Sequence, residues 1–340
     1  MHDVFYRLSI GAIVVTLVSG CGQLPDVPGM IEGDWDPPVF VTMRVSGKAE
    51  IVLVFDEPVE LLEFTGHAAL QLTATAQAFS QELTLRFTHD LDAGARYWLG
   101  ITVADEHGNR STVNTPFYGL NERVPHILIN EFVCEGSGNN PDWVELIVLS
   151  NGNLGGVTLA EGSPSLWESR KILPEVEVSA GDYVLVHFKP QMIPQEIDET
   201  VDKTASGGLN NSVNAWDFWV TDGDGIPNTT GALTLLSSPE GAVIDAVLYS
   251  NRRYDATHQR RGFGTPRQLA MFEEISELGA WIIQGEVVIP EDGIDPTDST
   301  ATRSLSRSST NGDTDSRSDW HVVPTSGATP GHVNSDEVYR

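Results

Sequence analysis

The heptapeptide D-G-D-G-I-P-N at residues 222–228 is the segment whose residue types best suit metal binding. Asp222 and Asp224 occupy alternate positions of a glycine-containing loop, and Asn228 follows four residues after Asp224. Calcium prefers clustered hard oxygen ligands, which carboxylates and amides supply. The spacing predicts a weak calcium site made of Asp222, Asp224 and Asn228. An ordinary turn without metal uses the same residue types and stays the alternative.

Arginine is concentrated in one short segment of an otherwise acidic chain. The formal net charge is −28. Arginine forks suit carboxylate, phosphate or sulfate groups, so this segment is a candidate anion or partner patch. The alternative is that its arginines pair with the chain's own acids, for example near Glu273, Glu274 and Glu277. The patch consists of Arg252, Arg253, Arg260, Arg261 and Arg267.

The remaining composition excludes several functions. The sequence contains no H-E-x-x-H, G-x-S-x-G or G-x-x-x-x-G-K-[ST] motif, and its nine His lack metal-ligand spacing. Its four Lys are too few and too scattered to neutralise a nucleic-acid backbone, so nucleic acid is not expected as the main partner. We therefore predict a protein that is not an enzyme and that holds no cofactor apart from the weak calcium.

Period-two alternation predicts an antiparallel β-sandwich over residues 36–121. Residues 83–88 place Leu83, Leu85 and Phe87 on one face, and residues 97–103 alternate in the same way. A third strand is expected at 50–55, and the D-E-P sequence at 56–58 predicts a turn after it. Residues 122–125 are expected to link this sandwich to a second domain.

A second set of short strands, bounded by Gly, Pro, Asn or Asp, predicts another β domain over residues 126–334. An insertion at about 250–297 is expected to contain a helix that covers a sheet face or edge. Thr265 and Gln268 fit a capping box there, Pro266 falls at the first helical position, and Gly279 ends the helix. The acidic stretch 290–300 is expected to be an exposed linker. The strands are predicted at 127–132, 141–147, 181–186, 217–220, 232–236 and 243–249.

The first residues of the sequence predict an export signal. Arg7 precedes an apolar run of about 11 residues, within the 7–15 of a secretory h-region and short of the ~20 that span a bilayer. The sequence V-S-G-C that ends at Cys21 resembles the lipobox of bacterial lipoproteins. The resemblance implies cleavage of residues 1–20, a lipid anchor on Cys21 and a tether over residues 21–35. Cys134 is then without a partner in the chain and is expected to be a small buried hydrophobe.

Longer motifs carry resemblances to two β-sandwich families. The segments "IVLVFDEPVE" and "GARYWLGITVADEHGNRS" are similar to bacterial immunoglobulin-like domains, which usually act as spacers or adhesive units. The segments "ILINEFVCEGSGNNPDWVELIVLSN", "EVSAGDYVLV", "GAVIDAVLYS" and "RSLSRSSTNGDTDSRSDWHVVPTSGATPGHVN" resemble, in order, the motifs of the lamin tail domain. That resemblance implies an immunoglobulin-like sandwich in which Trp143 and Trp320 anchor the core, followed by a tail at 335–340. The heptapeptide at 222–228 also resembles one calcium loop of the thrombospondin type 3 repeats.

The sequence thus predicts an all-β protein with two immunoglobulin-like β-sandwich domains in tandem, the second with a helix-containing insertion. We expect an exported bacterial lipoprotein at the outer membrane, cell surface or periplasm. Its expected role is structural or interactive, with an unknown protein or glycan of the envelope as partner. Two alternatives remain: an enzyme, or a protein associated with a secreted hydrolase, with an unrecognised site, and a calcium-dependent adhesin that uses the Asp222 loop.

Overall fold

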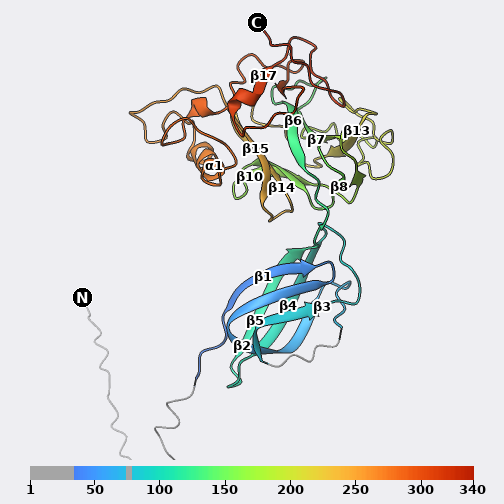
Figure 1. Ribbon diagram of the computed structural model, residues 1–340, viewed down its shortest axis with the longest axis vertical. Coiled ribbons are helices and arrows are strands. Elements are labelled where there is room, and N and C mark those ends of the chain that lie inside the picture. The colour runs from blue at the N-terminus through green and yellow to red at the C-terminus, as the bar shows by residue number, and fades with distance from the viewer. Residues whose placement is uncertain (1–33, 74–78) are drawn as a thin grey trace, which may run out of the picture.

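The computed structural model describes residues 34–73 and 79–340, and within them the chain is all-β with a single α-helix. The strands form two units that follow one another along the chain, β1–β5 and β6–β17 (Figure 1). Each unit surrounds its own hydrophobic cluster, the first between Ile51 and Phe117 and the second beginning at Ile127.

The first unit is a five-stranded antiparallel arrangement in which β2 pairs with β1, β3 and β4, and β4 pairs with β5. The predicted alternation is confirmed, because Leu83, Leu85 and Phe87 are all buried on one face, as are the alternate residues of 97–103. The strands are β1 (Phe40–Gly47), β2 (Glu50–Gly66), β3 (Ser80–Arg86), β4 (Arg96–Ala104) and β5 (Arg110–Tyr118).

The turn predicted at residues 56–58 is wrong, because β2 continues through it. The strand shifts register against β3 between Val54 and Val59, and from Glu60 onward it pairs with β4. Pro58 lies at this break, where its missing N–H removes no ladder hydrogen bond. The residues that signalled a turn instead lie just before the point where one long strand changes its pairing from β3 to β4.

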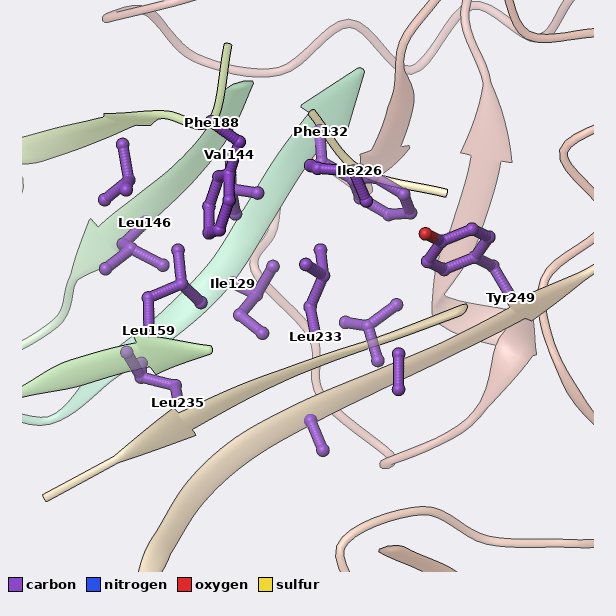
Figure 2. Packing of buried hydrophobic residues seen from close by; sticks show 14 of the residues in the cluster. Ile129, Phe132, Val144, Leu146, Leu159, Phe188, Ile226, Leu233, Leu235 and Tyr249 are labelled. Atoms are coloured by element: carbon purple, nitrogen blue, oxygen red, sulfur yellow. The ribbon is translucent and has the colours of Figure 1, made fainter. Parts of the chain in front are cut away.

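The second unit packs a six-stranded sheet against a four-stranded one. The six-stranded order is β13-β12-β7-β6-β16-β17, and the four-stranded order is β10-β9-β14-β15. Figure 2 shows Ile129 and Val144 from the first sheet beside Leu159 and Leu233 from the second. The first sheet comprises β6 (Ile127–Val133), β7 (Trp143–Val148), β12 (Tyr183–His187), β13 (Ala215–Trp219), β16 (Leu305–Arg307) and β17 (Trp320–Val322). The second comprises β9 (Thr158–Gly162), β10 (Trp167–Ile172), β14 (Thr230–Leu236) and β15 (Val243–Ser250), and a small pair joins β8 (Gly152–Asn153) to β11 (Glu177–Val178).

All six strands predicted for this unit are present, whereas the β9–β10 hairpin was missed. Cys134 is buried as expected, and Trp320 belongs to the core between the two sheets. Trp143 is also buried, but it lies in a separate small cluster with Val133, Leu185 and Ala215 and does not anchor that core. Burial also raises the pKa of the Cys134 thiol to about 12, so this thiol stays protonated and unreactive at neutral pH.

The insertion is part of the core of the second unit. Helix α1 (Pro266–Glu277) has the expected capping box between Thr265 and Gln268, and Phe272 and Ile275 are buried on the face that packs near β14. Leu278, at the C-cap, is exposed. The helix therefore covers a sheet, as predicted.

The expectation of an exposed linker at 290–300 is wrong. A short 3₁₀ helix, η2 (Pro290–Asp292), begins this stretch, and Ile294 then joins the edge of β15. The Ile294 N–H donates to Leu248 O at 2.8 Å, and the Ser250 N–H donates to Ile294 O at 2.7 Å. These backbone hydrogen bonds order a segment whose composition resembles that of a linker.

The two units touch through polar contacts next to the chain connection. The Asn121 amide donates to Asn153 O at 2.7 Å and to Gly155 O at 2.8 Å. The Ala93 N–H donates to Glu175 Oε1 at 2.7 Å. Hydrogen bonds therefore join the second unit both to the connecting segment and to the first unit.

Candidate functional site

The polar residues of the second unit's sequence motifs meet in its interior. Glu131 of β6 and Glu145 of β7 are directly opposite each other in the ladder, and both are 0% exposed. Burial raises the pKa of both carboxyl groups, and the charge of Glu131 raises that of Glu145 further. Two facing acids at the centre of a sheet need donors close by.

The chain's C-terminal segment supplies these donors. The Thr329 N–H donates to Glu131 Oε1 at 3.1 Å, and the Thr329 hydroxyl donates to Glu131 Oε2 at 2.9 Å. The Gly331 N–H donates to Glu145 Oε2 at 2.6 Å. The Asn334 amide donates to Arg307 O at 2.8 Å. The T-P-G-H-V-N sequence thus closes over the outer face of the six-stranded sheet.

Arg307 extends the network to the second sheet. Its side chain is 1% exposed, and Nη2 lies 3.2 Å from Asp245 Oδ2 while Nη1 lies 2.7 Å from Asp313 Oδ1. The guanidinium Nε–H donates to Ile129 O at 3.0 Å. Burial raises the pKa of Asp245 to about 7, and the charge of Arg307 opposes that rise. The motif side chains therefore act within the fold, beneath the surface.

A histidine–aspartate pair lies elsewhere in the same sheet. His187 Nε2 is 2.6 Å from Asp217 Oδ1, and both side chains are fully buried. The imidazole stacks on Trp219 with ring centroids 3.8 Å apart, and the Ser212 N–H donates to Asp217 Oδ2 at 3.0 Å. Because neither side chain reaches the surface, this pair holds β12 and β13 together and does not face an external substrate.

An acidic pocket of about 380 Å³ is the candidate site. Glu161 comes from β9, Glu168 from β10, and Asp222 and Asp224 from the loop after β13. The same loop contributes Gly225 and its two following residues to the wall. Carboxylates from three elements thus line one concave surface.

The loop at 221–228 is held in place by the core. Asp142 accepts hydrogen bonds from the Ile226 N–H at 2.9 Å and from the Gly136 N–H at 2.7 Å. The Tyr249 hydroxyl donates to Pro227 O at 2.6 Å. Gly225 adopts φ +102°, and a Cβ there would lie 2.4 Å from Asp142 Oδ2. Only glycine fits this position, so the loop presents Asp222 and Asp224 in a defined arrangement.

Glu161 is the unusual residue of the pocket. It is only 3% exposed, and burial, together with the neighbouring charge of Glu168, raises its pKa to about 7. Arg267 opposes that rise and lies 3.6 Å from Glu168 through its Nε. A carboxyl group that is partly protonated at neutral pH, beside further carboxylates, favours an incoming cation.

The structure brings together only part of the predicted calcium ligands. Asp222 and Asp224 both line the acidic pocket, whereas Asn228 does not belong to its wall. Glu161 and Glu168 were missed by the sequence analysis because the β9–β10 hairpin that carries them was not predicted. The W-E-S-R-K-I sequence of β10, with its charged side chains, gives little hydrophobic alternation from which to detect it.

Most of the arginine segment pairs with acids of the same chain. Arg261 forms an ion pair with Glu273, and its Nη1 donates to Val288 O at 3.0 Å. Arg253 lies 3.3 Å from Asp295. In the part of the chain that the structure describes, Arg252 and Arg260 have no carboxylate partner. Arg267 pairs with Glu168, which lines the acidic pocket. Three of the five arginines are thus paired with acids of the same chain.

Cys21 lies outside the described residues. Among residues 34–73 and 79–340, no helix is both long and apolar enough to cross a membrane.

Comparison with known proteins identifies the second unit. A family model named TP_1001_2nd, described as a protein second domain, matches residues 125–322. The chain belongs to this family. It is also similar to an uncharacterized protein of Treponema pallidum (strain Nichols), with 24% identity over 321 residues that cover 83% of this chain and 80% of that protein.

A solved structure gives a weaker likeness. The crystal structure of a DUF4876 family protein from Bacteroides thetaiotaomicron VPI-5482 covers 83% of this chain and 90% of its own, with 11% sequence identity and a TM-score of 0.29. A TM-score this low does not indicate a shared fold.

The raised pKa of Glu161 predicts that this side chain makes the free energy of unfolding depend on pH. A raised folded-state pKa contributes stability that is present below pH 4.5 and is lost as pH rises through about 7. Glu161→Gln should therefore gain stability relative to wild type across that window, by up to about 3 kcal/mol at pH 8. Urea unfolding followed by tryptophan fluorescence measures the difference. The exposed variant Glu240→Gln should show no such trend, and a pH-independent difference for Glu161→Gln would contradict the assignment.

Proposed function

We propose that this protein is an exported, lipid-anchored envelope protein with a structural and interactive role, and that it is not an enzyme. The observation that carries the proposal is the burial of the motif residues. Glu131, Glu145 and Arg307 are fully enclosed and engaged by other parts of the fold. Because these buried residues serve the fold, a partner must be recognised by surface residues. The surface feature best suited to this is the acidic pocket.

We further propose that both units are immunoglobulin-like sandwiches and that the second is a lamin tail domain. Two packed sheets in the second unit and an antiparallel arrangement in the first are compatible with this. The proposal gains support from the way in which the quoted motifs converge, since the I-N-E, W-V-E-L and T-P-G-x-x-N segments form one hydrogen-bonded group. In this chain the motif residues therefore have a structural role, which is to hold these three segments together.

The proposed interaction site is the acidic pocket lined by Glu161, Glu168, Asp222 and Asp224. Its chemistry suits a cationic group of an envelope protein or glycan, such as a protonated amine. A calcium-dependent adhesin is the second candidate, because Asp222 and Asp224 share the pocket with a buried glutamate. Nucleic acid does not fit a pocket of this charge.

The proposed lipid anchor on Cys21 predicts that a variant without this cysteine is not processed. Cys21→Ala should leave an unprocessed precursor that takes up no labelled fatty acid, because the acylated thiol is missing. Metabolic labelling followed by gel electrophoresis measures both effects. Cys134→Ala is the matched control, because its buried thiol should not affect labelling. Labelling of Cys21→Ala at the wild-type level would refute the lipid anchor.

If the acidic pocket binds the partner, substitutions of its carboxylates should weaken the contact with that partner. Chemical cross-linking of intact cells should give a set of adducts for the wild-type protein, and Glu168→Gln and Asp224→Asn should each reduce them together. Glu240→Gln, which removes an exposed acid outside the pocket, should leave the adducts unchanged. Adducts that persist in both pocket variants, with normal expression, would place the partner surface elsewhere.

A further inference from the structure

A second group of acids lies away from the acidic pocket, where β15 meets the loop between β16 and the 3₁₀ helix η3 (Arg317–Asp319). Asp245 comes from β15, and Asp313 and Asp315 come from the loop. One oxygen from each of the three carboxylates lies within 4.8 Å of the others. Segments some seventy positions apart in the sequence therefore place hard oxygen atoms at one point.

Asp245 provides an independent sign of a ligand. The residue is 1% exposed, and its Oδ2 accepts a hydrogen bond from the Ile129 N–H at 2.7 Å and faces Arg307 at 3.2 Å. Its Oδ1 is also buried but has no hydrogen-bond partner among residues 34–73 and 79–340. A buried carboxylate oxygen without a partner is costly, and a cation shared with neighbouring carboxylates would remove that cost.

The charges around the cluster are unbalanced. Arg307 contacts Asp245, Asp313 and Asp319, the last at 3.5 Å. Asp315 adds a fourth carboxylate, whose pKa is raised first by burial and then by the charges of Asp313 and Asp319. Within the described part of the chain, one guanidinium thus faces an excess of negative charge.

We propose that Asp245, Asp313 and Asp315 form a calcium site. The donor set consists of oxygen alone, without the imidazole or thiolate ligands that zinc prefers. Calcium accepts six to eight oxygen ligands in irregular geometry, whereas magnesium requires a near-ideal octahedron, so calcium suits carboxylates from two separate segments better.

A bound calcium ion would fasten the 311–319 loop to β15. The loop already touches the insertion, since the Ile282 N–H donates to Asp315 O at 2.6 Å. It also lies beside the Arg307 contacts that join the two sheets. The ion would therefore stabilise the second unit by linking its two sheets and its insertion. This site is separate from the acidic pocket and does not depend on the proposed function.

Calcium titration of the EDTA-treated full chain tests the site. The melting temperature should rise by roughly 5 to 10 °C at a calcium concentration about 100 times the Kd, with a smaller rise in magnesium. Asp315→Asn should abolish the rise, because it removes one ligand charge while asparagine tolerates the φ of +50° at this position. Asp224→Asn, in the acidic pocket, is the matched control and should keep the rise.

Terbium luminescence locates the ion without altering a ligand. Trp320 lies 4.9 Å from the Arg307 guanidinium and therefore close to the cluster. Excitation of tryptophan should sensitise bound terbium, and Trp320→Phe should reduce the signal more than Trp167→Phe. Trp167 is the comparison because it precedes Glu168, which lines the acidic pocket. Absence of a calcium effect in the wild-type protein would overturn the proposal. So would a calcium effect that Asp224→Asn abolishes, or a terbium signal that depends on Trp167.

Discussion

The architecture of the second unit depends on two carboxyl groups that face each other across its central strands. Glu131 and Glu145 are adjacent in the ladder and completely buried. Leaving either without donors would cost about 1–3 kcal/mol or more. The backbone of Thr329 and Gly331 must therefore reach them, which requires the chain to return over the sheet after β17.

This requirement explains why β6 and β7 are buried on both faces. One face contacts the four-stranded sheet, and the other carries Val133 and Trp143 in a small cluster against which Ala328 packs. The C-terminal segment is thus the cover of an outer face that would otherwise expose both acids and apolar side chains. Arg307 and Asn334 connect this cover to the strands beneath it.

Local patterns predicted many individual elements. Alternation located the buried faces of β3 and β4, and the Thr265–Gln268 capping box located the start of α1. Composition gave wrong predictions where pairing with distant strands decides the structure. Pro58 was expected in a turn but lies within a strand, and residues 290–300 were expected to be a linker but hydrogen-bond to the edge of β15.

The candidate sites were less predictable, for the same reason. Asp222 and Asp224 were identified from their spacing, but Glu161 joins them only through the fold. Likewise, nothing local relates Asp245 to Asp313 and Asp315. Both groups arise because strands distant in sequence are neighbours in space, and such pairing is set by the whole unit and not by any short pattern.

Hydrogen exchange at the Thr329 and Gly331 amides tests the central claim most directly, because these two N–H groups donate to the facing glutamates. If the C-terminal segment is an integral cover of the core, both amides should exchange as slowly as the Ile129 amide, which donates to the buried Asp245, and through the same global unfolding. Exchange of the Thr329 and Gly331 amides near the rate of an unprotected chain, with the Ile129 amide still protected, would contradict the account.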